Sequence, residues 1–421
     1  MKSSSYSGFF KLSVEDRLRE VQEFSNLSAE DVALLQNPDA LSMDKANHMV
    51  ENVIGRFSLP IGVGLNFLVN GKDYVVPMVT EEASVIAAAS NAAKMVRPLG
   101  GFFASNTGSI MIGQVQLVGI ADARVARLKI LEKKDEILQL CNQTDQMLVS
   151  LGGGMQDLEV RLIDSSVGPM VIVHLLVNTL DAMGANAVNT MAEALAPYLE
   201  ELTGGTAYLR ILSNLADHRL VRVRATVSKE TLGGDAVVDK LIIGHAFAAA
   251  DSYRAATHNK GIMNGMSAVV LATGNDTRAI ESGVHAFAAR SGRYSSIVSW
   301  EKDANGNLAG TLEVPMAVGL VGGATKIHPT AMVAVKMLGV KTAAELGHVI
   351  VAVGLANSLA SLRALATEGI QRGHMSLHAR NIATVAGAKG EVLDKIVSQM
   401  IAEKKVRLEY AQELMKKYQS G

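Results

Sequence analysis

The spacing of apolar and polar residues in the first hundred positions predicts helices followed by a β-hairpin. Helices are expected within 13–54, one of them capped by Ser28. Two apolar runs then flank Asn70-Gly71, the residue pair that two-residue hairpin turns favour, so a hairpin is predicted over 59–79. The alanine-rich segment from Val85 to Val96 has the length and composition of a helix.

Residues 108–217 predict a self-contained unit of alternating strands and helices. The predicted order is strand, helix, strand, strand, helix, strand, which is the split βαβ or ferredoxin-like arrangement. The segments are Ile110–Val118, Ala121–Leu140, Leu158–Leu162, Met170–Val177, Asn186–Leu202 and Ala207–Leu212. No glycine cluster here has the strand–GxGxxG–helix spacing, and no Walker A lysine pattern occurs, so neither a Rossmann nor a P-loop domain is indicated.

The remainder of the chain predicts longer helices and a second hairpin. The hairpin turn is expected at Asn305-Gly306-Asn307. A hinge-like break over 368–374 precedes a helical tail that runs to Gly421. The other predicted elements are a strand at Leu220–Ser228 and helices at Asp235–Ala250, Arg278–Ser291, Thr330–Met337, Ala343–Gly354 and Leu355–Thr367.

One stretch, 254–276, combines polar, glycine-rich and apolar segments. Glycines at 261 and 265 lie beside Lys260, where the missing side chains would let backbone approach a ligand. The apolar run that follows is typical of a buried strand delivering the carboxylate of Asp276 at its tip. The plainer alternative is a surface lysine followed by an ordinary core segment.

The composition is that of a well-packed globular protein with two or three domains. The chain has 421 residues, 48% of them hydrophobic and 19% charged. A net charge of −1 gives no electrostatic reason to expect nucleic acid or an anionic membrane as partner. The single cysteine, Cys141, excludes an intramolecular disulfide framework and a cysteine-based zinc site. No signal peptide or membrane span is indicated, so we expect a cytoplasmic protein with no membrane contact.

Several motifs each allow a plain structural interpretation when taken alone. Glu81 and Glu82 precede a helix, where acids commonly interact with the helix dipole, although a carboxylic acid beside an apolar helix can also serve as a general acid. Residues 181–186 open a helix whose N–H groups would suit a phosphate. Gly322-Gly323 followed by Lys326 is a second glycine-rich loop ending in a cation, which taken alone favours a plain turn with a solvated lysine.

Seven motifs in a fixed order remove this ambiguity, because together they resemble one family. The chain closely resembles the class II, bacterial-type 3-hydroxy-3-methylglutaryl-coenzyme A (HMG-CoA) reductases over essentially its whole length. The motifs are ENVIG at 51–55, EE at 81–82, DAMGAN at 181–186, ATHNKGIMNG at 256–265, GND at 274–276, GGATK at 322–326 and QRGHM at 371–375.

The resemblance implies an α+β fold with a division of labour. A large mixed α/β domain for HMG-CoA would comprise 1–107 and 218–373, the latter with the catalytic lysine and aspartate. The ferredoxin-like, non-Rossmann domain inserted at 108–217 would bind the nicotinamide cofactor. Residues 374–421 would form a helical C-terminal flap. This agrees with the independent interpretation of 108–217 as βαββαβ.

The resemblance also implies four catalytic residues for two successive hydride transfers. Lys260 would stabilise the carbonyl oxyanion. Glu82 would donate a proton as the hemithioacetal collapses and the aldehyde is reduced. Asp276 would link Lys260 and Glu82 by hydrogen bonds. His374, rather than the nearby His378, would protonate the departing CoA thiolate, since it directly precedes Met.

Further contacts carry over from the resemblance. Arg254, Ser84 and Asn264 match positions that hold the hydroxymethylglutaryl group, and Asn52 matches the CoA region. Asp145 falls where the cofactor's adenosine ribose is expected. A carboxylate there accepts hydrogen bonds from both ribose hydroxyls and repels a 2′-phosphate, so NAD(H) is favoured over NADP(H), which stays possible. The other implied cofactor contacts are Asp181, Met183, Gly184, Ala185, Asn186 and Asn214.

The implied activity is interconversion of HMG-CoA and mevalonate plus CoA, through mevaldyl-CoA and mevaldehyde. The family's sites lie at a subunit interface, so a homodimer or a higher homo-oligomer is implied, and no metal is expected. A non-redox acyl-CoA enzyme on a related scaffold is the alternative. An RNA-binding ferredoxin-like module is rejected, because 108–217 has neither basic charge nor stacking aromatics in an RNA-binding motif. The sequence leaves the physiological direction open.

Overall fold

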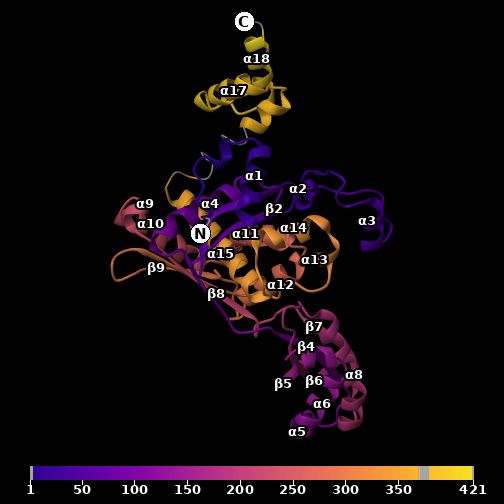
Figure 1. Ribbon diagram of the computed structural model, residues 1–421. Helices are drawn as coiled ribbons and strands as arrows, with labels where there is room; N and C mark the ends of the chain where they lie inside the picture. The colour runs from indigo at the N-terminus through magenta and orange to yellow at the C-terminus, as the bar shows by residue number, and fades with distance from the viewer. Residues whose placement is uncertain (1–2, 368, 370–378, 420–421) are drawn as a thin grey trace.

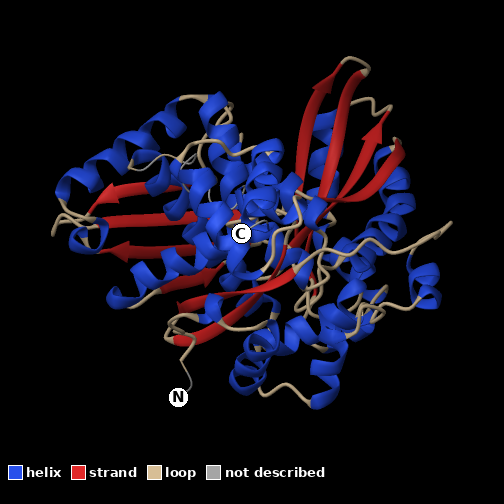
Figure 2. Cartoon of the chain, turned by 90° about the horizontal axis from the view of Figure 1, so that it is seen from above, coloured by secondary structure: helices blue, strands red, loops and turns tan. Residues whose placement is uncertain are grey.

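The computed structural model describes residues 3–367, 369 and 379–419, and it contains two β-sheets with helices packed against them (Figures 1 and 2). The mixed helical and stranded fold expected from the sequence is confirmed. The larger sheet has the strand order β2-β1-β3-β8-β10-β9. Its strands are β1 (Ile61–Val69), β2 (Lys72–Val79), β3 (Phe102–Asn106), β8 (Leu220–Val227), β9 (Val298–Lys302) and β10 (Leu308–Pro315).

The larger unit also contains helices, several of which pack against this sheet. The N-terminal ones are α1 (Val14–Ser25), α2 (Ala29–Gln36), α3 (Met43–Met49) and α4 (Val85–Val96). The later ones are α9 (Lys229–Leu232), α10 (Asp235–Ala250), α11 (Ser252–Ala272), α12 (Thr277–Ala288), α13 (Ala324–Ile327), α14 (Pro329–Leu338) and α15 (Ala343–Ala366). Helix α4 packs on β1, α11 on β2, and α15 on β3 and β8, so these three helices and the sheet share one hydrophobic core.

The predicted hairpin is confirmed, and its turn has the expected chemistry. Strands β1 and β2 pair antiparallel from Ile61 with Val79 to Val69 with Lys72. Asn70 and Gly71 both have positive φ, 49° and 77°, which is the conformation of a two-residue hairpin turn. Capping by Ser28 is also confirmed, since its hydroxyl accepts the N–H of Asp31 and the Asp31 carboxylate accepts the N–H of Ser28.

The smaller sheet has the order β5-β6-β4-β7 and carries the predicted βαββαβ sequence of elements. It projects from the larger unit (Figure 1). The predicted helix over Ala121–Leu140 is instead divided at Lys133, which lies outside both resulting helices. The elements are β4 (Ile110–Val118), α5 (Ala123–Glu132), α6 (Lys134–Gln143), α7 (Gln146–Ser150), β5 (Gly154–Ser165), β6 (Gly168–Asn178), α8 (Ala185–Thr203) and β7 (Thr206–Ser213).

The strand predicted before Asp276 is wrong, because the apolar run belongs to α11. Asp251 caps this helix by accepting the backbone N–H of Arg254. Its buried residues recur at helical spacing: Ile262, Met263, Met266, Val269 and Val270. A short apolar run fits a buried strand or a buried helix equally well, so only packing could decide between them.

Of the two glycines beside Lys260, Gly265 admits a neighbouring helix, whereas a Cβ on Gly261 would make only an ordinary contact at 3.6 Å with Ser361. A Cβ on Gly265 would lie 2.8 Å from the Asn357 side chain and 3.0 Å from that of Val353, both on α15. Reciprocally, a Cβ on Gly354 of α15 would lie 2.6 Å from Met266. The absence of these side chains lets α11 and α15 approach closely.

Helix α15 is continuous over 24 residues, where the sequence predicted two shorter helices divided after Gly354. By length and composition alone it could cross a membrane, and it is the one helix in the described ranges that could. Most of it is buried, however, and it packs against α4, α10, α11 and β8. It is therefore interpreted as the central core helix.

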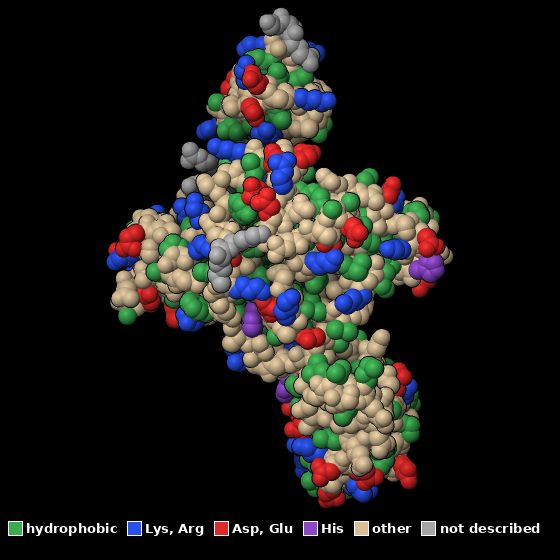
Figure 3. Space-filling model, viewed as in Figure 1, with side chains coloured by type: hydrophobic (Ala, Val, Ile, Leu, Met, Phe, Trp, Pro, Cys, Tyr) green, Lys and Arg blue, Asp and Glu red, His purple; other side chains and the backbone are tan. Residues whose placement is uncertain are grey.

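The C-terminal residues form a small helical unit with its own apolar cluster. It contains helical residues 379–385, α17 (Gly390–Ala402) and α18 (Leu408–Gln419), and Ala383, Ile396 and Leu414 are among the residues of its core. The unit stands at the opposite end of the molecule from the smaller sheet (Figure 1). Lys and Arg side chains are interspersed with Asp and Glu over the visible face of the molecule, as the near-zero net charge implies (Figure 3).

Candidate active site

The structure brings three of the predicted site residues together, although they come from distant parts of the chain. The Lys260 ammonium donates to Glu82 Oε2 at 2.7 Å, and the Asn264 amide donates to the same oxygen at 3.1 Å. Lys260 and Asn264 lie one turn apart on α11, so they project from the same face of that helix. The Lys260 and Glu82 side chains are 61% and 38% exposed, which leaves the pair open to a reactant.

The local backbone holds Glu82 out of the helix that follows it. The N–H of Glu82 donates to Thr80 Oγ1 at 3.1 Å. Ser84, at the N-cap of α4, has φ 78°, a left-handed conformation that is unusual for a residue other than glycine. The Glu82 carboxylate therefore binds Lys260 and Asn264 across the molecule, and the interpretation of this acid as a simple helix-dipole partner is not supported.

A second polar network lies near this cluster, and no motif in the sequence predicts it. Ser267, seven residues after Lys260 on α11, donates to Glu281 on α12 at 2.5 Å. Glu281 also contacts the His285 ring at 3.3 Å, and His285 contacts the Tyr294 hydroxyl at 2.7 Å. The hydrogen bond from His285 holds the pKa of Glu281 below its ordinary value, with smaller contributions from Ser267 and the charge of Lys260. An anionic carboxylate thus lies within the electrostatic reach of Lys260.

Arg254 lies two turns before Lys260 in a partly buried setting. Its backbone N–H is fixed by Asp251, and burial lowers the pKa of its guanidinium. His258, one turn further on, is 3% exposed and its ring centroid lies 6.3 Å from that of His245. Burial, with the charges of Arg254 and His245, lowers the pKa of His258 to about 3, so this histidine is neutral in the folded protein at neutral pH.

Asp276 does not link Lys260 and Glu82 within the described chain. Its carboxylate caps α12, accepts the N–H groups of Arg278 and Ala279, and pairs with the Arg278 side chain. Burial raises its pKa, but these bonds outweigh burial and hold the pKa below the ordinary value. At a rise of about 1.5 Å per residue, the part of α11 from Lys260 to Ala272 spans about 18 Å, which separates the two motifs.

The predicted cofactor motif lies at the N-terminus of α8, at the junction of the two sheets. Gly184 has φ 97°, and a Cβ there would lie 2.2 Å from Thr179 Cγ2. No side chain caps α8, so its first N–H groups suit the phosphate of a dinucleotide. Met183, Ala185 and Asn186 belong to this loop and first turn, whereas Asp181 Oδ1 accepts the backbone N–H of Ala343 at the start of α15.

Asp145 lies at the same end of the smaller sheet as the cofactor motif. It caps the short helix α7 by accepting the N–H of Leu148 at 2.9 Å. A Cβ on Gly153 would lie 2.6 Å from Leu148 and 2.7 Å from the carbonyl of Asn178, so α7 packs close to the end of β6, just before DAMGAN. One carboxylate oxygen of Asp145, Oδ1, serves this cap.

Asn214 and Asn52 are both exposed, in different parts of the structure. Asn214 follows β7, and its carbonyl would lie 2.4 Å from a Cβ on Gly283 of α12. Asn52 lies in the loop after α3 with φ 57°, next to Ile54, which is fully exposed. His374 lies outside the described residues, as does the rest of the predicted break at 368–374 except Gly369.

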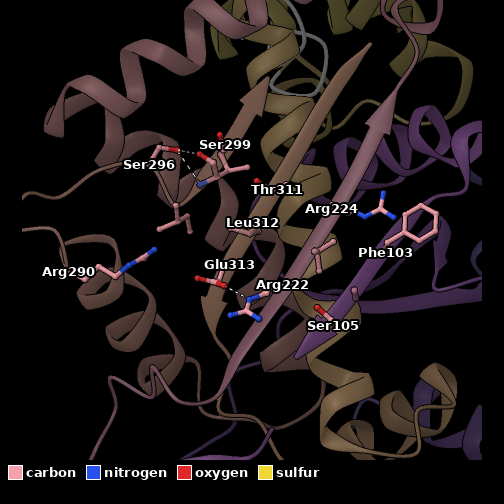
Figure 4. A pocket seen from close by; sticks show the side chains of 14 residues that line it. Phe103, Ser105, Arg222, Arg224, Arg290, Ser296, Ser299, Thr311, Leu312 and Glu313 are labelled. Atoms are coloured by element: carbon pink, nitrogen blue, oxygen red, sulfur yellow. Dashed lines mark hydrogen bonds and ion pairs between the residues drawn. The ribbon is translucent and has the colours of Figure 1, made fainter. Parts of the chain in front are cut away.

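A groove lies on a different part of the molecule, against strands β3, β8, β9 and β10 of the six-stranded sheet (Figure 4). Its volume is about 620 Å³, and the predicted site residues do not line it. Arg222 pairs with Glu313, and the Arg224 guanidinium lies 4.3 Å from the Phe103 ring centroid. Because none of the predicted site residues lines this groove, the cluster of Lys260, Glu82 and Asn264 is retained as the candidate active site.

The buried neutral state of His258 predicts a specific pH dependence of stability. Its folded pKa, about 3, lies below the unfolded value near 6.5, so between these values the unfolded chain binds more protons and stability falls as the pH is lowered. Replacing His258 by Phe should reduce the slope of the unfolding free energy with pH by up to about 1.4 kcal/mol per pH unit in this window. Denaturant unfolding from pH 4 to 6.5 measures the slope, with the exposed His48→Phe as control. Parallel slopes for wild type and His258→Phe would contradict the assignment.

The comparison with known proteins agrees with this geometry. The family profile described as hydroxymethylglutaryl-coenzyme A reductase matches residues 13–379. A 3-hydroxy-3-methylglutaryl-coenzyme A reductase from Archaeoglobus fulgidus is 54% identical over 99% of this chain and 95% of its own length. A probable reductase of the same name from Borreliella burgdorferi is 32% identical over 96% of this chain and 94% of its own.

Solved structures show the same fold. The Streptococcus pneumoniae 3-hydroxy-3-methylglutaryl-coenzyme A reductase has a TM-score of 0.85 and 42% identity, covering 98% of this chain and 100% of that one. A structure of the class II enzyme from the same organism, bound to NADPH in open conformations, has a TM-score of 0.84 at 43% identity, covering 86% and 100%. From the profile match and the full-length relatives, the chain belongs to the hydroxymethylglutaryl-coenzyme A reductase family, whose members are oxidoreductases of mevalonate metabolism.

Proposed function

We propose that the protein interconverts HMG-CoA and mevalonate plus CoA, with catalysis centred on the Lys260–Glu82–Asn264 cluster. The observation that carries this proposal is the 2.7 Å contact between an exposed ammonium and an exposed carboxylate 178 positions apart in the chain. If a thioester carbonyl binds beside Lys260, the ammonium can stabilise the negative charge that develops on its oxygen. The Glu82 carboxyl group, which contacts Lys260, is then close enough to transfer a proton.

The roles of the chain's own groups follow from their chemistry. A bound nicotinamide cofactor supplies or accepts the hydride. Lys260 stabilises the oxyanion, and Glu82 in its protonated form delivers a proton as the hemithioacetal collapses and the aldehyde is reduced. Asn264 fixes the orientation of the Glu82 carboxylate, and Arg254 and Ser84 hold the hydroxymethylglutaryl group. His374 is proposed to protonate the departing thiolate on the basis of its motif alone.

The division of labour between segments is part of the proposal. Residues 1–107 and 218–373 bind HMG-CoA, residues 108–217 bind the nicotinamide cofactor, and 374–421 close over the reactants. The uncapped N-terminus of α8 and the close packing at Gly184 support the assignment of the cofactor to the smaller domain. We place the enzyme in the cytoplasm, because its one cysteine, Cys141, forms no disulfide. Burial raises the pKa of the Cys141 thiol to about 12.

The complete site is proposed to form between two subunits. Within one chain, Asp276 follows the C-terminal end of α11, and the helical segment from Lys260 to that end is about 18 Å long, whereas a second copy can bring its own Asp276 to the Lys260–Glu82 pair. The loop carrying Asn52 also exposes Ile54 completely and Phe57 to 91%, which favours a covering partner. We propose a homodimer as the minimal active assembly.

The cofactor is proposed to be NADH in preference to NADPH. The second oxygen of Asp145 can accept from ribose hydroxyls, whereas its charge opposes a 2′-phosphate. The relative from S. pneumoniae binds NADPH, which makes a direct comparison of the two cofactors necessary.

Substitution of Lys260 should abolish turnover without unfolding the protein. Lys260→Ala should lower kcat with HMG-CoA by about 100-fold or more, because the oxyanion loses its cation, while the Tm changes little since the side chain is exposed. Lys302→Ala is a matched control, because Lys302 forms a similar 2.5 Å pair with Asp239 away from the site. Loss of nicotinamide absorbance measures both variants. Full activity in Lys260→Ala, or a wild type that oxidises neither NADH nor NADPH, would favour the non-redox acyl-CoA alternative.

Heterodimers should test the shared site directly. A purified heterodimer of one Lys260→Ala and one Asp276→Asn subunit would contain one intact and one doubly altered site, so about half of wild-type activity should return. The control is the Lys260→Ala and Glu82→Gln pair, which should recover nothing because both groups belong to one chain's half-site. Failure of the first pair to recover activity would contradict the interface.

Removal of the Asp145 carboxylate should change cofactor preference. Asp145→Ala should reduce the ratio of kcat/KM for NADH to that for NADPH by about tenfold, because the repulsion of the 2′-phosphate is lost. Loss of the cap on the five-residue helix α7 also changes stability, so Asp122→Ala, which removes the cap of α5, is the control. A preference for NADPH in the wild type would refute the proposal.

A further inference from the structure

Arg219 is a buried cation at the junction between the two sheets. It follows the linker from β7 and directly precedes β8, and it is 3% exposed. Its guanidinium donates to Thr179 Oγ1 and to the carbonyls of Ala182 and Val318 at 3.0, 3.0 and 2.6 Å, and to the carbonyl of Met183 at 3.4 Å. All four acceptors are neutral.

Burying a guanidinium costs free energy when no carboxylate is bonded to it. Its hydrogen-bonding geometry is therefore expected to have a structural purpose. Burial lowers the pKa of the guanidinium to about 10, with the charge of Asp181 acting in the opposite direction. Planar, divergent N–H groups let one arginine bind several carbonyls at once, whereas a lysine offers donors from a single nitrogen. The side chain therefore acts as a multi-point bracket for backbone.

The bracket joins three segments that have no sequence proximity. Ala182 and Met183 belong to the cofactor motif at the end of β6, Val318 belongs to the loop after β10, and Arg219 belongs to the interdomain linker. The backbone of Arg219 also takes part, because its carbonyl accepts the N–H of Met316 at 3.0 Å.

The same two loops are joined along their backbones. Leu320 N–H donates to the Asp181 carbonyl at 2.8 Å, and Ala182 and Val321 form a parallel bridge. Gly319 packs so closely that a Cβ there would lie 2.5 Å from Met183 N. Gly319 N–H in turn donates to Asn275 Oδ1 at 2.8 Å, beside Asp276. The cofactor motif is thus fixed to the motif that carries the catalytic aspartate.

Thr179 connects this bracket to the start of α8. Its hydroxyl accepts from Arg219 and donates to the Ala182 carbonyl at 3.0 Å, while its methyl group faces Gly184. The position of Gly184 determines where the first N–H groups of α8 point. A displacement of Arg219 would therefore be transmitted to the α8 N-terminus.

We propose that Arg219 is a positioning residue for the nicotinamide cofactor, which holds the DAMGAN loop in its binding conformation against the Asn275–Asp276 motif. The inference rests on the proposed function, because it assumes that a dinucleotide binds at this loop. It assigns a role to a residue outside every motif that the sequence singled out.

The test compares Arg219→Lys with wild type by fluorescence titration of NADH and NADPH, and by steady-state kinetics. Arg219→Lys should raise the cofactor Kd and KM by about tenfold or more, while the KM for HMG-CoA stays within about twofold. Thr179→Val, which keeps the shape but removes the hydroxyl, should shift the cofactor Kd in the same direction by a smaller factor.

Arg97→Lys is the matched control. Arg97 is a partly buried arginine that, like Arg219, makes several hydrogen bonds, to Asp73, Ser4 and the Asn66 carbonyl, but it lies in the large domain away from the cofactor motif. It should lower Tm without changing the cofactor Kd. If Arg219→Lys lowers Tm and leaves the cofactor Kd unchanged, its role is structural and the inference is overturned. A wild type that binds neither cofactor would instead overturn the proposed function, and this inference with it.

Discussion

The close packing of α11 against α15 is the constraint on which the candidate site depends. Gly265 and Gly354 allow the two helices to approach closely, and this packing holds the 21-residue helix α11 in the core. Lys260 and Asn264 project from its middle toward Glu82, and Asp276 follows its end. The length of the helix therefore sets the separation between the two chemical motifs, and with it the need for a second subunit in the proposed mechanism.

The junction between the sheets is the second structural requirement. A cofactor domain that projects from the main body must present its dinucleotide to groups on another domain, so its binding loop needs a fixed reference. Backbone bonds between 181–182 and 320–321, the Asn275–Gly319 contact and the buried Arg219 supply that reference. The bonds between 181–182 and 320–321 join backbone to backbone, and Arg219 binds mainly backbone carbonyls. Every residue type has these backbone atoms, so the side chains of the two loops do not reveal the contacts.

Local features of the fold were predictable because their causes are local. Asn70-Gly71 specifies its hairpin through backbone conformation, Ser28 specifies its helix start through a side-chain acceptor, and the strands of 108–217 show their periodicity directly. The apolar run before Asp276 predicts a strand, because a short run of buried residues fits a buried strand as well as a buried helix. The division predicted within α15 was wrong for a related reason, since Gly354 interrupts the pattern but is needed for helix packing.

By itself, the sequence determined the family, the type of fold and the residue types of the site. Motifs and local propensities depend only on which residues follow one another along the chain. Tertiary structure alone decided which of those residues meet. It paired Lys260 with Glu82, placed Asp276 at the N-terminus of α12, and revealed the Ser267–Glu281–His285 network and the Arg219 bracket. Contacts between groups far apart in the chain depend on helix lengths, packing distances and backbone acceptors, and these are properties of the folded molecule rather than of any short stretch of sequence.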